Sequence, residues 1–470
     1  MKKKCIVWFT QDLRLSDHRA LHQAINSGCE VIPLYIYREE DPTWKMGAAS
    51  KWWLHHSLKS LSDSLEEKGA RLILRKGPSL KVFKELIKET GASAVFWHSR
   101  VEPFARKEEE SVKELLESLS CESFSFWDNM LYVPGDILNG QGEPYKVFTP
   151  FYNRCLNVGG IKPSLKAPRE VPCVKGSIHS EHLKDLTLLP DKDWDEHFPS
   201  MWLPGEKNAK ARLQKFCGKV TEYTKQRDFP YEEGTSLLSP HLHFGEISPS
   251  QVVHAIRESS LHKGEGYVRQ LIWREFAAQM LYFFPKTDLH PLREEFAAFP
   301  WKKSAKHLHQ WQKGQTGYPI VDAGMRQLWS LGFMHNRLRM IVGSFLVKDL
   351  LIPWQEGAFW FWDTLVDADL ANNSFGWQWI AGCGADAAPY FRIFNPITQG
   401  EKFDPEGRYV RAFVPELKDL PSKWIHKPWE APEDVLRAAG VILGKTYPRP
   451  IVDHDEARKI ALDALKYTRK

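Results

Sequence analysis

Short apolar runs alternate with segments of helical period over the first 130 residues. The runs are rich in β-branched and aromatic side chains and cover residues 4–9, 31–37, 71–76, 94–98 and 123–127. Between them, residues 50–67 and 79–88 show the spacing of amphipathic helices. Strands alternating with such helices predict a parallel sheet covered on both faces. We therefore expect a doubly wound, Rossmann-like α/β domain over residues 1–130, with its ligand crevice at the carboxyl ends of the strands. No GxGxxG follows the first run, so the dinucleotide fingerprint is absent.

The pattern changes after this domain. Residues 131–204 lose their period and gain helix breakers, as in LYVPGDILNGQGEPY and IKPSLKAPREVP, which predicts a long connector. Beyond residue 204 the periodic segments are helical, and they cover residues 209–223, 248–258, 266–283, 324–331 and 336–351. We therefore expect an all-helical second domain over residues 205–470. The fold class is α/β plus all-α.

Composition narrows the class of protein. A chain of 470 residues predicts two or three domains. No apolar run approaches the roughly 18 residues of a membrane helix, and the run after MKKK is too short for a secretory signal, which predicts a cytoplasmic protein. The seven cysteines show no paired spacing, so we expect them to be reduced and buried. A net charge of +5 permits polyanion binding without requiring it. The histidine pairs 241/243 and 307/309 have no third ligand nearby, so no metal is expected.

Candidate chemistry concentrates in residues 362–399. Aromatic, acidic and amide side chains are mixed there without amphipathic period: Trp362, Trp377, Trp379, Asp367, Asp369, Asn372, Asn373 and Arg392. Aromatic faces beside hydrogen-bonding groups suit a large flat heterocycle, which is either a cofactor or an unstacked base. The hydroxyl-rich turn at residues 235–239 suits a pyrophosphate or, equally, plain helix caps. Core packing is the expected role of Trp311, Trp329, Trp360 and also Trp362.

The chain resembles the photolyase/cryptochrome family, in the class I cyclobutane pyrimidine dimer photolyase form. The resemblance covers nearly the whole chain and rests on motifs in family order, which include CIVWFTQDLRLSDHRAL, RDFPYEEGTSLLSP, LIWREF, TGYPIVDAGMRQL, MHNRLRM, DADLANN, GWQW and YFRIFNP. It implies a carbon–carbon lyase that repairs DNA in light, with reduced, anionic FAD as the electron donor. The alternatives are a (6-4) photoproduct photolyase and a cryptochrome-type photoreceptor without repair activity. The chain ends without a long polar tail, which favours repair over signalling.

The resemblance assigns residues to the flavin. The implied cofactor-binding set is Tyr223, Thr235, Ser236, Leu237, Leu238, Ser239, Tyr267, Arg274, Arg339, Asp367, Ala368, Asp369 and Asn373. In this set Asp367 pairs with Arg339, and Asn373 faces flavin N5, where an amide supplies no proton. The implied catalytic set adds a chain of tryptophans that carries electrons to the flavin, namely Trp377, Trp354 and Trp301.

A second implied set binds ultraviolet-damaged DNA. Its members are Gln270, Trp273, Asn336, Arg337, Met340, Trp379 and Gln399. Trp273 and Trp379 would wedge a flipped-out dimer, and Arg337 would hold phosphates. Dimer photolyases usually have a glutamate at the position of Gln270, whereas (6-4) photolyases have a glutamine there. Those enzymes, however, have two histidines where this chain has His335 followed by Asn336, which favours dimer repair.

The resemblance also leaves open a second, light-harvesting chromophore in the α/β domain. Pro103 and Phe104 stand where folate-binding members have a polar pair. A deazaflavin, flavin mononucleotide, folate or an empty crevice are the alternatives. We expect a monomer without a membrane or obligate protein partner.

Overall fold

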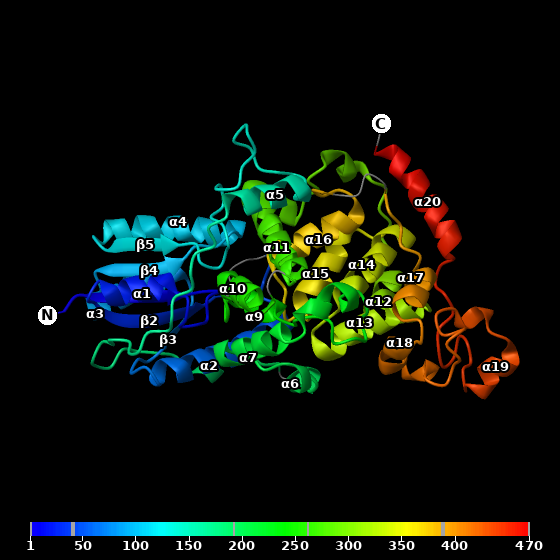
Figure 1. Ribbon diagram of the computed structural model, residues 1–470, viewed down its shortest axis with the longest axis horizontal. Helices are drawn as coiled ribbons and strands as arrows, with labels where there is room; N and C mark the ends of the chain where they lie inside the picture. The colour runs from blue at the N-terminus through cyan, green and yellow to red at the C-terminus, as the bar shows by residue number, and fades with distance from the viewer. Residues whose placement is uncertain (1, 39–42, 191–192, 261–262, 387–390, 469–470) are drawn as a thin grey trace. The chain divides into compact units, whose positions relative to one another are not determined.

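A computed structural model describes residues 2–38, 43–190, 193–260, 263–386 and 391–468 (Figure 1). The chain divides into two compact units that are each discontinuous in sequence. The first unit comprises Met1–Thr221, Ser236–Pro285 and Val366–Ala371. The second comprises Glu222–Thr235, Lys286–Leu365 and Asn372–Lys470.

The first unit contains a parallel sheet with the strand order β3-β2-β1-β4-β5 (Figure 1). Its strands are β1 (Lys4–Phe9), β2 (Glu30–Tyr37), β3 (Ile73–Lys76), β4 (Ala94–His98) and β5 (Glu122–Phe126). The central strand β1 pairs with β2 on one side and with β4 on the other, so that Cys5 lies between Val31 and Ala94. Both neighbours of β1 are reached through crossovers, which is the doubly wound arrangement. The predicted fold class is confirmed.

Helices cover both faces of this sheet. The helices between strands are α1 (Arg19–Asn26), α2 (Ala48–Glu66), α3 (Ser79–Thr90) and α4 (Pro103–Ser118). One face packs Trp8 and its neighbours against Phe83 of α3 and Leu116 of α4. On the opposite face, α1 packs against β1, β4 and β5, and Phe9 lies 4.9 Å from the ring of His18. The strands β1, β2 and β4 are buried because helices lie on each face, whereas the edge strand β5 is largely exposed.

The first unit also contains helices from the connector and from further along the chain. They are α5 (Phe148–Val158), α6 (Phe198–Met201), α7 (Glu206–Cys217), α9 (Ser239–His243), α10 (Pro249–Ser260) and α11 (Glu265–Phe283), with short 3₁₀ turns at Leu183–Leu186, Asp193–Asp195 and Val220–Glu222. Sequence reasoning missed α5. Its buried residues Phe148, Phe151 and Cys155 have helical spacing, and α5 packs against α11 (Figure 1).

The second unit is helical in its described part. Its helices are α8 (Tyr223–Gln226), α12 (Ala305–Gln312), α13 (Pro319–Leu331), α14 (Asn336–Ser344), α15 (Trp354–Thr364), α16 (Leu370–Ala381, with two residues counted in the first unit), α17 (Pro396–Phe403), α18 (Arg408–Phe413), α19 (Glu433–Ala438) and α20 (His454–Tyr467). The helix predicted over residues 336–351 is shorter than expected, because α14 ends at Ser344 and a π-helical turn, Phe345–Asp349, replaces its last part. Short 3₁₀ turns occur at Pro285–Asp288, Glu294–Ala298, Pro415–Leu417 and Pro428–Glu430.

The structure bears on three further expectations, which concern cysteines, tryptophans and membrane helices. All seven cysteines are free; five are buried as expected, but Cys173 and Cys217 are partly exposed. Trp311 is buried as predicted, whereas Trp329 is 43% exposed and is therefore not a core residue. Across the described ranges no helix combines the length and the apolarity needed to cross a membrane.

Candidate functional site

A hydroxyl-bearing turn lies in the first unit at Ser236–Ser239. Leu237 has a φ of 53°, a left-handed conformation that a branched apolar residue rarely adopts. The Leu238 N–H donates to Ser236 Oγ at 3.2 Å, and Ser236 Oγ lies 2.8 Å from the hydroxyl of Tyr267 on α11. The structure thus brings three members of the predicted flavin set together. Ser239 follows as the exposed first residue of α9, and Thr235, which precedes the turn, is partly exposed.

The predicted acidic members lie on a segment of the first unit just before and at the start of α16. Asp367 and Ala368 are buried, whereas the side chain of Asp369 is 20% exposed. Asp369 Oδ2 lies 3.5 Å from His243 Nδ1. The predicted pairing of Asp367 with Arg339 stays a prediction. A partly exposed carboxylate beside a histidine can accept a hydrogen bond from a ribose or a base.

Four predicted residues lie on α11. The Gln270 amide donates to the Gly266 carbonyl at 3.4 Å. Trp273 stacks on Phe148 of α5, with ring centroids 3.5 Å apart and planes 7° apart, so one face of this predicted wedge is covered. Arg274 Nη1 donates to the Asn129 carbonyl at 2.9 Å and so binds a segment that sequence reasoning did not connect to α11.

The predicted electron chain lies in the second unit. Trp377 on α16 and Trp354 at the start of α15 are 2% and 1% exposed, whereas Trp301 is partly exposed. Two members of the predicted chain are therefore buried and the third is nearer the surface, and electron transfer through them stays a prediction. Gly357 makes the packing possible, because a Cβ at this position would lie 2.1 Å from Trp377 Cη2.

Residues of α16 also provide a test of whether a cofactor would fit. The Asn373 amide nitrogen donates to the Ala358 carbonyl at 3.0 Å, which fixes the orientation of the side chain. The buried Ser374 Oγ and Trp377 Nε1 have no hydrogen-bond partner within the described ranges. Buried donors are nearly always satisfied in native proteins. These two atoms therefore fit the presence of a bound polar group.

The predicted DNA-binding residues of α14 are partly engaged within the second unit. Asn336 is exposed, and its amide lies 3.9 Å from the sulfur of Met340. Arg337 forms an ion pair with Asp228 at 2.8 Å, and its guanidinium lies 4.3 Å from the centre of the Phe403 ring. A phosphate would therefore meet Arg337 already oriented by a carboxylate and an aromatic ring.

The remaining predicted residues of the second unit lie apart in sequence. Tyr223 is buried with the Arg227 guanidinium 5.3 Å from its ring, and Arg339 donates through Nε to the Met334 carbonyl at 2.8 Å. Trp379 on α16 and Gln399 on α17 are partly exposed. The Gln399 carbonyl oxygen has no partner among the residues described.

Sequence reasoning missed buried polar groups that hold these elements. Glu275, next to Arg274, is fully buried and accepts from the Leu131 and Tyr132 N–H groups at 2.9 and 3.3 Å. Burial raises the pKa of Glu275 to about 7, against the opposing charge of Arg274. His241, rejected as a metal ligand, is bonded through Nδ1 to the Glu246 carboxylate. A charged residue inside an apolar motif such as LIWREF was the available signal for Glu275.

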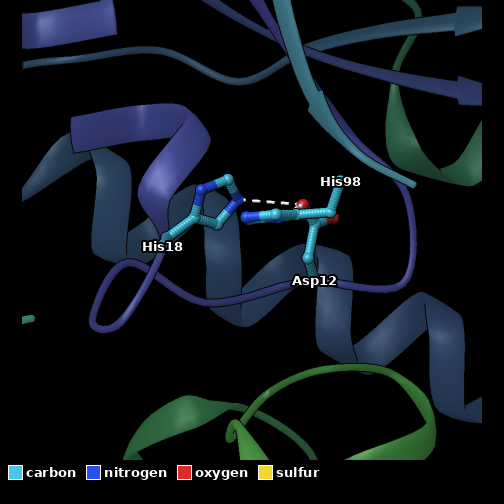
Figure 2. A group of neighbouring side chains, drawn as sticks. All are labelled: Asp12, His18 and His98. Atoms are coloured by element: carbon cyan, nitrogen blue, oxygen red, sulfur yellow. Dashed lines mark hydrogen bonds and ion pairs between the residues drawn. The ribbon is translucent and has the colours of Figure 1, made fainter. Parts of the chain in front are cut away.

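A second missed feature is a buried cluster at the carboxyl ends of β1 and β4. It consists of Asp12, His18 and His98 (Figure 2). All three side chains are fully buried. Asp12 and His18 are six residues apart, but His98 lies 80 residues beyond His18, so no local spacing indicates the cluster.

Comparison with known proteins gives two family matches. Residues 5–172 match the model described as DNA photolyase. Residues 267–467 match the model described as the FAD binding domain of DNA photolyase. Together the two matches include nearly all of the sheet of the first unit and extend from the first turn of α11 to the end of α20.

Individual relatives align over almost the whole chain. Deoxyribodipyrimidine photo-lyase of Agrobacterium fabrum is 49% identical in an alignment of length 473 that covers 99% of this chain and 98% of the relative. Cryptochrome-1 of Arabidopsis thaliana is 38% identical over 98% of this chain and 70% of its own. A solved structure described as a bacterial class III photolyase from Agrobacterium tumefaciens has a TM-score of 0.97 and 46% identity, with 100% of this chain and 98% of that chain covered.

Proposed function

This chain belongs to the photolyase/cryptochrome family, and on that premise we propose that it splits cyclobutane pyrimidine dimers in DNA with light. The observation that carries the proposal is the 49% identity, over nearly full length, to a protein named deoxyribodipyrimidine photo-lyase. The subclass remains a prediction: class I was expected from the motifs, whereas a similar structure is described as class III.

FAD, when bound, would supply the electron that cleaves the dimer. The residues proposed to hold it are the Ser236–Ser239 turn, Tyr267, the Asp367–Asp369 segment and Asn373. The bond from the Asn373 amide to the Ala358 carbonyl holds this side chain in one orientation. An amide supplies no proton at neutral pH. It is therefore suited to a site that keeps an anionic flavin unprotonated.

The choice of lesion rests on the residues at the start of α14. Repair of a (6-4) photoproduct requires a proton donor, and Asn336 cannot act as one. His335 is buried and accepts from the Arg337 N–H through Nδ1 at 3.2 Å. Burial lowers the pKa of His335 to about 4, so it is neutral at physiological pH. Both facts support dimer repair over (6-4) repair.

The decisive experiment uses wild-type protein and oligonucleotides that each carry one lesion. We expect light-dependent restoration of the cyclobutane dimer and no restoration of the (6-4) photoproduct. The reverse result would overturn the choice of lesion. Repair of neither lesion by a protein that binds FAD would favour the photoreceptor alternative, to which the 38% identity to a plant cryptochrome lends weight.

Trp377→Phe separates electron supply from repair. If Trp377 passes electrons to the flavin, the variant loses photoreduction of oxidised flavin but keeps repair when the enzyme is first reduced chemically. Trp202→Phe, a buried tryptophan of the first unit, is the control and should keep both activities. Parallel loss of photoreduction and repair in Trp377→Phe would show that the residue is structural.

Three further parts of the proposal follow from the family. We infer that ultraviolet-damaged DNA binds through Gln270, Trp273, Asn336, Arg337, Met340, Trp379 and Gln399. A second light-harvesting chromophore would use the crevice at the carboxyl ends of the strands. We propose that the protein is cytoplasmic. We also propose that it is a monomer, which light scattering of the purified protein would test.

A further inference from the structure

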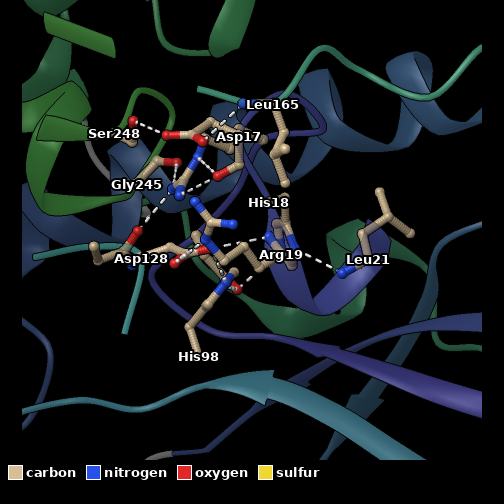
Figure 3. A network of polar contacts seen from close by, with 12 residues as sticks. Asp17, His18, Arg19, Leu21, His98, Asp128, Leu165, Gly245 and Ser248 are labelled. Carbon is tan, nitrogen blue, oxygen red and sulfur yellow. Dashed lines mark hydrogen bonds and ion pairs between the residues drawn. The ribbon is translucent and has the colours of Figure 1, made fainter. Parts of the chain in front are cut away.

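Four buried side chains meet at the carboxyl edge of the sheet. Asp12 follows β1, His18 caps α1, His98 ends β4, and Asp128 follows β5 (Figures 2 and 3). His18 Nε2 and His98 Nδ1 lie 3.0 and 2.6 Å from the same oxygen, Asp12 Oδ2. His98 Nε2 lies 3.3 Å from Asp128 Oδ2. The flavin chemistry proposed above uses none of the four.

His18 is neutral in this arrangement. Its Nδ1 accepts a hydrogen bond of 3.0 Å from the Leu21 N–H, so the ring proton is on Nε2, which faces Asp12. Burial lowers the pKa of His18 to about 4, and the charge of His98 acts in the same direction. His18 therefore places a neutral ring 3.0 Å from Asp12 Oδ2, without the alignment of a hydrogen bond and without adding charge.

His98 differs because each of its nitrogens faces a carboxylate. A carboxylate oxygen only accepts hydrogen bonds, so Nδ1, 2.6 Å from Asp12 Oδ2, carries a proton. Nε2 lies at ion-pair distance from Asp128 without the alignment of a hydrogen bond, and a second carboxylate at 3.3 Å favours a proton on this nitrogen as well. Burial acts to lower the pKa of His98, but Asp12 and Asp128 outweigh it and the pKa is raised. Although burial acts to raise the pKa of Asp128, His98 and Arg19 lower it to about 2. The ionised pair of carboxylates and the imidazolium therefore support one another.

A metal ion does not fit the same residues. A histidine that binds a metal donates its other ring N–H to an acceptor. His18 instead accepts at Nδ1, so Nε2 has no free lone pair. The positive charges of Arg14 and Arg19, which neighbour the cluster, would also oppose a dication. The residues fit two protonated ring nitrogens on His98 better than they fit a metal.

The cluster is connected to α11 through the residues after Asp128. Asn129 accepts from Arg14 at 2.7 Å through its side chain and from Arg274 at 2.9 Å through its carbonyl. The next residues, Leu131 and Tyr132, donate their N–H groups to Glu275. Arg14 also donates to the carbonyls of Asp17 and Gly245. Figure 3 shows Asp17 and Gly245 in the polar network beside Asp128. Because of these hydrogen bonds, a displacement of Asp128 would also displace Arg274 and Glu275, two consecutive residues of α11.

We propose that His98 is a doubly protonated imidazolium, clamped between Asp12 and Asp128, that positions α11 through residues 128–132. His98 is thus a positioning residue for the helix that carries Gln270, Trp273 and Arg274. The inference rests on the proposed function only for the consequence at α11. The proposed protonation of His98 does not depend on the proposed function.

The clamp depends on pH in one direction. The pKa of His98 is raised in the folded protein, so the clamp contributes fully below the ordinary histidine value and is lost as the pH rises through the raised value. The groups that face it are Asp12, Asp128 and His18, with Arg14 and Arg19 behind the carboxylates. Alkaline conditions therefore loosen the hold on residues 128–132.

The first test is nitrogen NMR of the full-length protein with ¹⁵N-labelled histidine, assigned with His98→Asn and His18→Asn. We expect two protonated nitrogens on His98 and one on His18 near pH 7. In Asp128→Asn, His98 should lose one proton, while the surface variant His254→Asn should leave its signal unchanged. A singly protonated His98 in the wild type, or a stoichiometric metal found by elemental analysis, would overturn the proposal.

The second test compares unfolding and FAD release across pH. Relative to His98→Asn, the unfolding constant of the wild type should rise by up to about tenfold per pH unit above the ordinary histidine pKa. FAD release should follow the same profile in the wild type and be flat in the variant. Equal profiles would exclude the clamp. Failure of either protein to bind FAD at any pH would contradict the proposed function and leave the NMR result standing.

Discussion

Two buried cations, one in each unit, show opposite ways of keeping a charge inside the protein. His98 lies between two carboxylates, and its pKa is raised. Lys348 lies on the π-helical turn Phe345–Asp349, with its ammonium 3.2 Å from the centre of the Phe391 ring and 3.5 Å from the Arg392 carbonyl. Burial lowers the pKa of Lys348 to about 7.

The difference lies in what faces the charge. Asp349, next to Lys348 in sequence, is bonded to His454 at 2.5 Å, and burial raises its pKa to about 6. It therefore compensates the lysine poorly. An aromatic face and a carbonyl offset less of the desolvation cost than two carboxylates do. The first unit fixes its polar edge by charge pairing, and the second fixes its turn by aromatic packing.

Removing the shared carboxylate should give the largest effect. Asp12→Asn removes one of the two carboxylates that face the buried His98, and we expect the protein to lose about 3–5 kcal/mol of unfolding free energy near neutral pH. Urea unfolding measures the loss. Asp63→Asn, which removes an exposed partner of Lys59, should cost under about 0.5 kcal/mol. A small effect at Asp12 would mean that charge pairing does not hold the sheet edge.

Removing the charge of Lys348 should change stability in the opposite direction. Lys348→Met eliminates a buried charge while keeping the length of the side chain, so we expect the variant to be more stable by about 1–4 kcal/mol near pH 6. Above the pKa that Lys348 has in the folded protein, the unfolding free energy of the wild type should rise by up to about 1.4 kcal/mol per pH unit. The reason is that in this range the unfolded chain binds one more proton than the folded chain. A constant difference across pH would contradict the lowered pKa of Lys348.

Breaking the aromatic packing should have a somewhat smaller effect. Gly357→Ala puts a Cβ against the Trp377 ring and should destabilise the protein by about 1–3 kcal/mol. Gly376→Ala on α16 is the matched control, because a Cβ there meets nothing within 4 Å. It should stabilise the helix by about 0.5–1 kcal/mol. Thermal unfolding of both variants would show whether the first change is specific to the contact with Trp377.

Arg337 is held by both charge pairing and aromatic packing, and its removal should have the smallest effect of the four changes. It is held by Asp228 and by the Phe403 ring. Arg337→Ala should weaken binding to damaged and undamaged duplex alike and reduce the salt slope by about one unit. Arg408→Ala, which removes a partner of Glu232, should leave the slope unchanged. A slope that is the same in wild type and Arg337→Ala would assign the phosphate contact to another residue.

Local pattern was sufficient for the sheet but not for its polar edge. Runs such as KCIVWF predicted β1 because strand propensity and burial act on neighbouring residues. The pairing of Asp12 with His98 depends on strand order, since β4 lies beside β1 only in the folded sheet. A motif cannot indicate such a contact.

The candidate site shows the same limit. Family motifs supplied the residues proposed for FAD and DNA, and the structure brought Ser236, Leu238 and Tyr267 together. The stack of Phe148 on Trp273 was missed because Phe148 lies in a connector interrupted by proline and glycine. The π-helical turn was missed because its sequence continues the helical period, and only the tertiary structure interrupts it.

The stack of Phe148 on Trp273 has a consequence for how this protein can change over generations. A substitution at either ring alters the surface offered to the other, so the two positions constrain one another although they are 125 residues apart. A variant that reshapes α11 for a different base would need a compensating change in α5. A change in substrate preference would therefore involve the connector as well as α11. Mutant libraries that randomise Trp273 should randomise Phe148 with it.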